Sequence, residues 1–315
     1  MTDKANSWIM PGDAVERLRK DGFFITSSPI SAADLDTIKR ELEDWKSTPA
    51  VNGYGCIFSA GDALLQNVGL YSPAALKIAL AEDILDFMER AFGQPALLAK
   101  IEYRRAVEPK SEMPLHCDPG HDISVYIYLD GVCPDTGSTY VIPGTHEIGL
   151  SMNDGYIQVP DAARSKFGRA PAIVEGPPGL CLFFHTNTWH GRTATVRPGR
   201  ELLWLSYVPR DWATEQLNLV VSIKALKQLS PRQIDAMGIG SPVQGRSGED
   251  FRLSRRLDFS SLNLLPLSYL VRITVLRIAR STYHMLPHNL RATVRKAVAV
   301  LRPDAEKQHY TKITN

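Results

Sequence analysis

The feature that most limits the fold of this chain is a series of short β-type segments between residues 96 and 208. Each segment is rich in branched aliphatic and aromatic residues, and prolines and glycines interrupt the series at short intervals. The segments are 97–105, 123–130, 138–142, 172–175, 180–185 and 201–208. Short strands separated by turn residues are typical of a sandwich or a jelly roll. We therefore expect a mainly β core.

Helical patterns precede these strands. Apolar residues keep helical spacing through residues 31–46, and Ser31 with Asp34 three positions later forms a capping-box pattern. Ser72 is placed to begin a second helix as its N-cap. Residues 47–71 are rich in glycine, and we expect them to form an irregular loop over a pocket. Helices followed by many strands predict an α+β protein with helices packed outside a jelly-roll core.

Charge is distributed unevenly between a long body and a basic C-terminal extension. From residue 252 onward twelve basic residues face three acidic ones, a net charge of +9, which leaves −7 for residues 1–251 of a chain with a total of +2. We therefore predict a jelly-roll domain with N-terminal helices at 1–250 and a basic helical extension at 251–315. Arginines interrupt the apolar segments of 262–301, so these segments cannot span a bilayer.

Three interpretations of the basic extension stay open. It can pack back on the acidic body, lie on an anionic membrane surface through 262–301, or bind nucleic acid. The chain has no recognised nucleic-acid motif, so we do not expect nucleic acid as a partner. The four cysteines lack a framework spacing, and residues 1–11 lack the apolar core of a signal peptide. We therefore expect a cytoplasmic protein, with peripheral contact to the inner face of the membrane as the alternative.

A histidine and an aspartate two residues apart, His116 and Asp118, begin the part of the sequence that suggests chemistry. In an extended segment residues two apart point to the same face, so both side chains can reach one point. A histidine from another strand, with His190 as the candidate, would complete a set of two histidines and one carboxylate. That set leaves coordination positions open on non-haem Fe(II) for a second substrate and O2.

The order of several motifs extends this pattern. The motifs are Asp21-Gly22-Phe23-Phe24, His116-Cys117-Asp118, Tyr128-Leu129-Asp130, Gly137 through His146, Phe184-His185 with His190, and Arg200 before Leu202-Leu203-Trp204. A lone His-x-Asp is a weak signal, whereas the ordered set is specific. It resembles the phytanoyl-CoA dioxygenase family of Fe(II)/2-oxoglutarate oxygenases over about residues 10–212. The resemblance implies a double-stranded β-helix, the jelly-roll or cupin-like core of that family.

The resemblance also implies an activity. Fe(II) held by His116, Asp118 and His190 would use 2-oxoglutarate and O2 to hydroxylate an aliphatic carbon, with release of succinate and CO2. Halogenases of this broad class lack the carboxylate, so Asp118 favours hydroxylation over halogenation. Desaturation and epimerisation stay open. A different class, a non-oxidative jelly-roll protein that binds a metal or a ligand, is the alternative function.

Arg200 is the candidate partner for the distal carboxylate of 2-oxoglutarate, because a guanidinium can donate two parallel hydrogen bonds to a carboxylate. Alternation places Trp204 on the face of Arg200, lining the barrel interior. Arg192 stands where the family often has a small polar residue, which leaves the second partner of the carboxylate open between Thr193 and Thr195. Tyr103 is a further candidate to face the cofactor, with a core tyrosine as the alternative.

The substrate has no readable code in the sequence. Specificity is expected from loops such as 47–71 and 150–172. If the extension contacts a membrane, a lipid, a glycolipid or an envelope precursor is a more plausible substrate than a small free metabolite. A small-molecule or lipid-linked substrate and O2 are therefore the expected partners.

Overall fold

The computed structural model describes residues 8–27, 29–43, 45–46, 56–59, 61–118, 120–148, 157–159, 168–212, 219, 225, 228–238, 242–244 and 250–252. The helices are α1 (Ala14–Asp21), α2 (Ala32–Glu43), α3 (Pro73–Ala79), α4 (Glu82–Phe92) and α7 (Pro231–Ala236), with 3-10 turns η1 (Val68–Leu70), η2 (Thr145–Glu147) and η3 (Arg210–Trp212). The strands are β1 (Phe23–Thr26), β2 (Cys56–Ser59), β3 (Asp62–Gln66), β4 (Ala96–Ala106), β5 (Met113–Cys117), β6 (Ile123–Tyr128), β7 (Thr139–Val141), β8 (Ile157–Gln158), β9 (Ala172–Ile173), β10 (Cys181–His185), β11 (His190–Arg192), β12 (Glu201–Pro209), β13 (Pro242–Gln244) and β14 (Asp250–Arg252).

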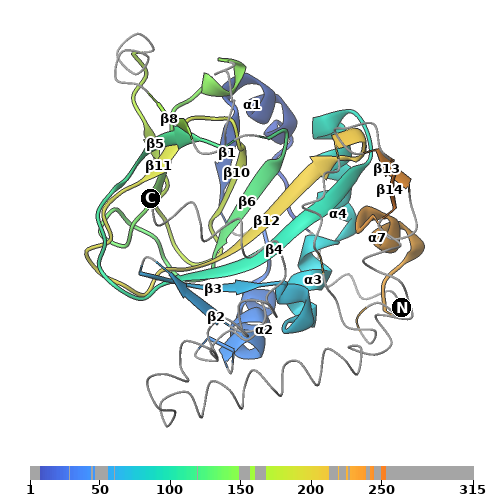
Figure 1. The fold of residues 1–315 in the computed structure, drawn as a ribbon, viewed down its shortest axis with the longest axis horizontal. Coiled ribbons are helices and arrows are strands. Elements are labelled where there is room, and N and C mark those ends of the chain that lie inside the picture. The colour runs from blue at the N-terminus through green and yellow to red at the C-terminus, as the bar shows by residue number, and fades with distance from the viewer. Residues whose placement is uncertain are drawn as a thin grey trace, which may run out of the picture.

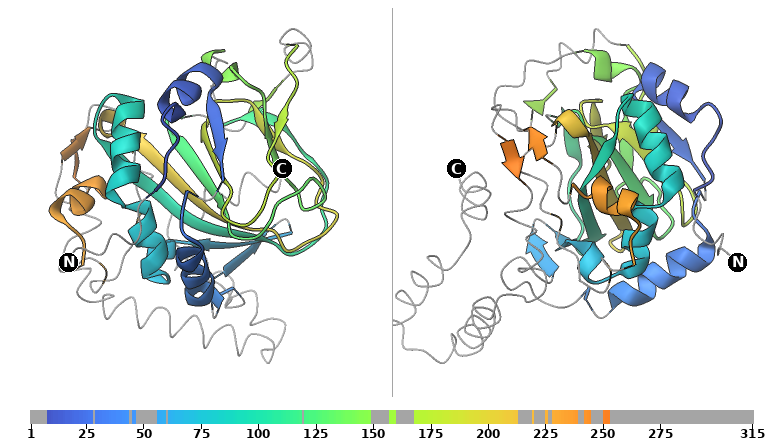
Figure 2. Two further views of the ribbon diagram at one scale, coloured as in Figure 1. Left: turned by 180° about the vertical axis from the view of Figure 1, so that it is seen from behind. Right: turned by 90° about the vertical axis from the view of Figure 1, so that its right-hand side faces the viewer.

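Two antiparallel sheets form the core. The larger sheet has seven strands in the order β1-β10-β6-β12-β4-β3-β2, and the smaller has five in the order β8-β5-β11-β7-β9. Helices α1 to α4 lie together on one side of the larger sheet, away from the smaller one (Figures 1 and 2). This arrangement confirms the predicted mainly β fold, a jelly roll with helices packed outside it.

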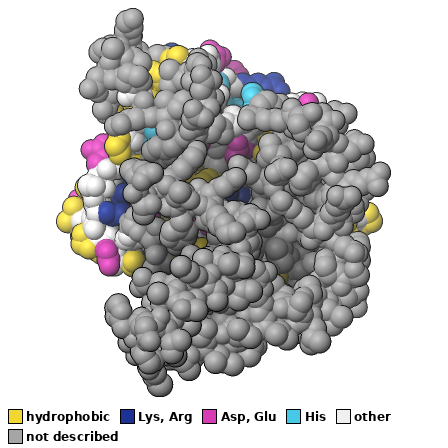
Figure 3. All heavy atoms as spheres, in the orientation of Figure 1, with side chains coloured by type: hydrophobic (Ala, Val, Ile, Leu, Met, Phe, Trp, Pro, Cys, Tyr) yellow, Lys and Arg dark blue, Asp and Glu magenta, His cyan; other side chains and the backbone are white. Residues whose placement is uncertain are grey.

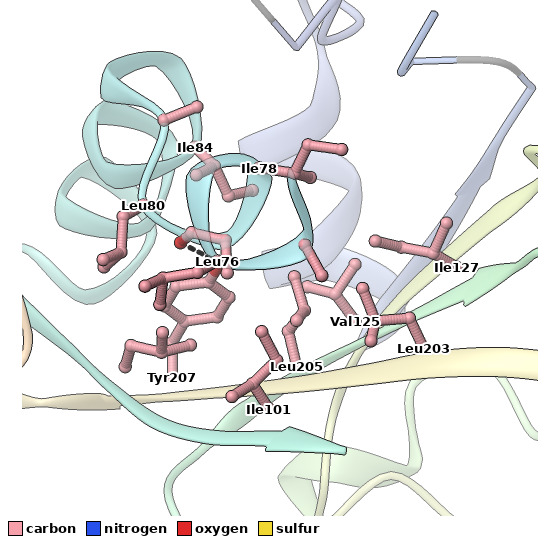
Figure 4. Close-up of a cluster of buried hydrophobic side chains, with 14 of the residues drawn as sticks. Leu76, Ile78, Leu80, Ile84, Ile101, Val125, Ile127, Leu203, Leu205 and Tyr207 are labelled. Atoms are coloured by element: carbon pink, nitrogen blue, oxygen red, sulfur yellow. Dashed lines mark hydrogen bonds between the residues drawn. The ribbon is translucent and has the colours of Figure 1, made fainter. Parts of the chain in front are cut away.

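The central strand β12 shows why the apolar runs of the sequence form this core. It lies between β4 and β6, and its side chains are buried on both faces. Leu203, Leu205 and Tyr207 face the helices, where the Tyr207 hydroxyl donates to the carbonyl of Ala79 at 2.7 Å (Figure 4). Leu202 belongs to a separate apolar cluster between the two sheets. A strand covered on both faces needs apolar residues at consecutive positions, which explains the unbroken run.

The predicted helix starts are present. The Ser31 hydroxyl oxygen accepts from the backbone N–H of Asp34 at 3.1 Å, ahead of α2, and Ser72 caps α3 by accepting from Ala75 N–H at 3.0 Å. Helix α4 ends at Gly93, whose left-handed conformation (φ 72°) closes the last turn.

The expectation of an irregular loop at 47–71 is wrong for its second half. Strands β2 and β3 pair with each other, and β3 adds to the edge of β4, so this segment extends the larger sheet. The pairing with β4 is a tertiary contact that a glycine-rich local sequence does not reveal. Residues 47–55 lie outside the described residues.

The domain division at residue 250 stays a prediction, because 253–315 lie outside the described residues and so does the predicted membrane-surface segment 262–301. Among the helices that the structure describes, none has the length and hydropathy needed to cross a bilayer. On the described surface visible in Figure 3, hydrophobic, basic and acidic side chains are mixed.

Candidate metal and cosubstrate site

Neighbouring strands of the smaller sheet bring the two predicted histidines together. His190 on β11 pairs directly with His116 on β5, and the centroids of their rings lie 4.3 Å apart. Asp118 follows β5, with one carboxylate oxygen 4.0 Å from Nε2 of His116 and the other 3.7 Å from Nε2 of His190. The three ligand atoms lie within 4.8 Å of one another. One point between them is therefore within reach of all three side chains.

Backbone carbonyls fix the orientation of both rings. Nδ1 of His116 lies 2.8 Å from the carbonyl of Pro114, and Nδ1 of His190 lies 2.8 Å from the carbonyl of Thr188. A carbonyl can only accept, so each Nδ1 carries a proton, and Nε2 is the ring nitrogen that faces Asp118 and can bind a metal ion. Burial, with a smaller contribution from His116, lowers the pKa of His190 to about 4. The His190 ring is thus neutral at pH 7 and available to a metal ion.

A network of hydrogen bonds positions the backbone of Asp118. The backbone N–H of Asp118 donates to the carbonyl of Thr186 at 3.0 Å. The Thr186 hydroxyl donates to one oxygen of Asp122 at 3.1 Å, and the Ser206 hydroxyl donates to the other at 2.8 Å. Asp122 therefore connects the loop of Asp118 to β12 of the larger sheet. Two imidazoles with Nε2 turned inward and one carboxylate on such a frame suit Fe(II) with open positions.

Arg200 lies buried immediately before β12, with 6% of its surface exposed. Its Nη1 donates to the carbonyl of Gly137, while its buried Nε has no hydrogen-bond partner among the described residues. A buried guanidinium donor without an acceptor is costly, and a bound carboxylate would supply one. Gly137 has a φ of 83°, and a Cβ there would lie 2.3 Å from Oγ1 of Thr195, so this position needs glycine.

The structure separates the two threonines that the sequence left open. The Thr193 hydroxyl donates to the carbonyl of Pro134 at 2.6 Å and is not brought to Arg200. Thr195 is buried, and its hydroxyl oxygen accepts from Nη1 of Arg192 at 2.6 Å. Since that oxygen accepts from Arg192, the Thr195 proton is left to donate elsewhere. Arg192 is buried as well and also donates to the carbonyl of Ser111 at 3.1 Å.

The other two predicted cofactor contacts lie elsewhere. Tyr103 pairs with Leu203 in the register of β4 and β12, so it points to the helix-covered face and not to the histidines. Trp204 does face the interior, but Leu202 separates it from Arg200 along β12, and its indole N–H donates to Ser124 at 2.9 Å. Trp204 therefore lines the interior at a distance from the predicted carboxylate anchor.

Sequence reasoning missed two charged residues on β4 that share the face of Trp204. Lys100 and Arg104 stand at alternate positions with Glu102 between them. The signal was present as the alternation of charged and apolar residues in Lys100–Arg104, but only the strand register shows which face is inward. His185 lies instead on the outer face, with its ring stacked on that of His146 at 5.4 Å.

Comparison with known proteins gives a consistent result. The family model for phytanoyl-CoA dioxygenase matches residues 18–196. Ectoine dioxygenase of Stutzerimonas stutzeri (strain A1501) is 24% identical, over 59% of this chain and 72% of that protein. Two solved structures share the fold: EctD from S. alaskensis with bound Fe (15% identity, TM-score 0.53, 66% of this chain and 79% of that one), and the non-heme alpha-ketoglutarate-dependent epimerase SnoN from nogalamycin biosynthesis (17%, 0.52, 63% and 82%).

Proposed function

This chain belongs to the phytanoyl-CoA dioxygenase family and is a 2-oxoglutarate-dependent dioxygenase, and we propose that it hydroxylates an aliphatic carbon of an organic substrate with His116, Asp118 and His190 as its iron ligands. The observation that carries the proposal is the convergence of two Nε2 atoms and one carboxylate within 4.8 Å. Iron held there would supply, together with 2-oxoglutarate and O2, the oxidation of an unreactive C–H bond, with release of succinate and CO2.

The protein itself orients the metal ligands and shields the metal site from water. The carbonyls of Pro114 and Thr188 hold the two rings with Nε2 inward, so that the ligands are preorganised before a metal arrives. Asp118 keeps the carboxylate position that halogenases lack, and this favours hydroxylation. Phe184, whose ring lies 5.0 Å from that of His190, gives the metal site an apolar wall that limits access of water.

We assign the cosubstrate's distal carboxylate to Arg200, whose buried Nε lacks a protein acceptor among the described residues. The guanidinium would form two charge-assisted hydrogen bonds with the carboxylate, and Thr195, oriented by Arg192, would donate a third. In this assignment Thr195 takes the role of the small polar residue that the family often has at the position of Arg192. Thr193 has no part in it, because its hydroxyl is occupied by Pro134.

The test of the proposed reaction is a substrate screen read by succinate formation. With Fe(II), 2-oxoglutarate and O2, a true substrate should raise succinate release and gain one oxygen atom from isotopically heavy O2. Asp118→Ala should abolish both signals. Substrate-independent binding of 2-oxoglutarate without any oxidation in a broad screen would favour the non-oxidative binding protein, and a product without added oxygen would point to desaturation or epimerisation.

The segment 262–301, on which the membrane prediction depends, lies outside the described residues. We keep a lipid-linked substrate and peripheral contact with a membrane through 262–301 as predictions, which rest on the basic, apolar composition of that segment. A cytoplasmic location is also kept as a prediction. Flotation with anionic and with neutral vesicles tests membrane contact, and failure to float with anionic vesicles would contradict it.

A further inference from the structure

The inner face of β4 carries an unusual set of charges. Side chains of Lys100 and Arg104 both lie over the ring of Trp204, with the Lys100 ammonium 3.7 Å and the Arg104 guanidinium carbon 4.2 Å from its centroid. Register explains this geometry, because Trp204 on β12 stands opposite Glu102 and therefore between the two cations. Glu102 is buried and accepts from Nε of Arg104 at 2.9 Å.

Neither cation is fully satisfied within the described part of the chain. The Lys100 ammonium has no hydrogen-bond acceptor or ion-pair partner among the described residues, although it is only partly exposed. The Nη groups of Arg104 likewise find no acceptor there, since its ion pair with Glu102 uses Nε. Burial and the neighbouring positive charge of Arg104 lower the pKa of Lys100, against the attraction of Glu102, Asp122 and Asp118. Burial of an ammonium costs free energy unless it donates to an acceptor. A bound ligand would supply the acceptor that the described residues do not give Lys100.

The two cations belong to the same interior as the metal ligands. Four rings connect them in sequence: His190 to Phe184 at 5.0 Å, Phe184 to Tyr126 at 5.1 Å, and Tyr126 to Trp204 at 5.6 Å between centroids. The charge of Asp118 also acts on both Lys100 and Tyr126. An aromatic wall therefore leads from the iron position to a positively charged end.

We propose that Lys100 and the Nη groups of Arg104 bind an anionic group of the organic substrate, a carboxylate or a phosphate, while Tyr126 and Trp204 line the path of its hydrocarbon part toward the iron position. The proposal rests on the proposed function, because it assigns the substrate class of that site. Glu102 pairs with Arg104 through Nε, which leaves the Lys100 ammonium and the Nη groups of Arg104 as donors for the ligand. Arg200 and Thr195 take no part, since they are assigned to the distal carboxylate of the cosubstrate.

The experiment measures whether small anions bind near the metal when 2-oxoglutarate is already bound. The protein is loaded with paramagnetic Co(II) and 2-oxoglutarate, and nuclear relaxation is recorded for inorganic phosphate and for neutral trimethyl phosphate. Acetate and methyl acetate form the carboxylate arm. In wild type the nuclear relaxation of each anion should be enhanced well above that of its neutral counterpart. The pair of probes with the larger difference identifies whether the site prefers a phosphate or a carboxylate.

Variants decide which residues cause the enhancement. Lys100→Met, which keeps an apolar stem over Trp204, should weaken anion binding by about tenfold. Lys77→Met, on the exposed face of α3, should leave anion binding unchanged. Arg104→Met is made together with Glu102→Gln, so that no buried carboxylate is left without its partner, and should also weaken it. Circular dichroism melts confirm folding of each variant.

Two outcomes would overturn the inference: no difference between anion and neutral probe in wild type, or an anion effect that survives Lys100→Met. Failure of the proposed function looks different. In that case anaerobic Fe(II) protein would give no charge-transfer band with 2-oxoglutarate, whatever the anion probes show. A band in wild type without anion binding at Lys100 would leave the dioxygenase site in place and reject only the anionic substrate.

Discussion

The outer face of β4 and β12 packs apolar side chains against helices, whereas the inner face of the same two strands carries Lys100, Arg104 and Trp204. Arg200, another buried cation, directly precedes β12. Both faces are largely buried, yet only the outer one gains the full stability that apolar burial gives. Buried cations on the inner face cost stability unless a ligand compensates them. The outer face therefore contains the residues that stabilise the fold, and the inner face contains the residues that we expect to bind ligands.

The largest effect on stability should come from the outer face. Leu203→Ala removes a fully buried side chain from the cluster of Figure 4 and should lower the free energy of unfolding by about 2–5 kcal/mol. Below the melting temperature its affinity for 2-oxoglutarate should stay within about twofold of wild type. Denaturant titration and cosubstrate titration measure the two quantities, and a large loss of affinity in folded protein would mean that the faces are not independent.

Arg200→Leu should weaken the binding of 2-oxoglutarate strongly without lowering the stability of the fold. Loss of the charge-assisted hydrogen bonds to the cosubstrate should weaken 2-oxoglutarate binding by about 3 kcal/mol, or roughly 150-fold. Stability without cosubstrate should be unchanged or higher, because a buried charge has been removed. Arg197→Leu is the matched control, since the side chain of Arg197 is 65% exposed. Equal weakening by both variants would argue against Arg200 as the anchor.

Asp122 tests the connection between the larger sheet and the metal ligands. Asp122→Ala removes the acceptor of both Thr186 and Ser206, so the loop of Asp118 loses its support. Affinity for Co(II) should fall about 10- to 100-fold, with partial recovery in Asp122→Asn, which retains one acceptor oxygen. Metal titration provides the readout. A variant with unchanged metal affinity would show that Asp118 is positioned by its own strand alone.

The smallest effect distinguishes the two threonines. Thr195→Val should weaken 2-oxoglutarate by about fivefold, the value of one hydrogen bond near 1 kcal/mol, while Thr193→Val should change it less than about twofold. Each variant loses one hydroxyl and keeps its shape, so the pair forms its own control. The opposite ranking would place the second carboxylate partner at Thr193.

Much of this molecule could be predicted from local sequence. The apolar runs locate the main strands because strands buried on both faces need them, and the ordered motifs indicate His116, Asp118 and His190 before any fold is known. Strand register could not be predicted in the same way. Tyr103 was a candidate to face the cofactor, with a core position as the alternative, and its pairing with Leu203 places it in the core under the helices.

Loops and sheet edges were the other source of error. Whether Thr193 or Thr195 turns inward depends on how the chain leaves β11, which local propensity does not encode. Strands β2 and β3 were missed because their glycine-rich surroundings resemble a loop, and only the edge of β4 stabilises them. Lys100 was overlooked for the same reason as Tyr103, since its inward direction follows from register.

The most direct test of the central claim needs no substrate. Fe(II) and then 2-oxoglutarate are added under anaerobic conditions to wild type, Asp118→Ala and Arg200→Leu, and the visible charge-transfer band of the chelated keto acid is recorded. The structure predicts a band in wild type, no band in Asp118→Ala, and in Arg200→Leu a band that appears only at much higher 2-oxoglutarate. A folded, metal-loaded wild type without the band would contradict the assignment of His116, Asp118 and His190 to an oxygenase site.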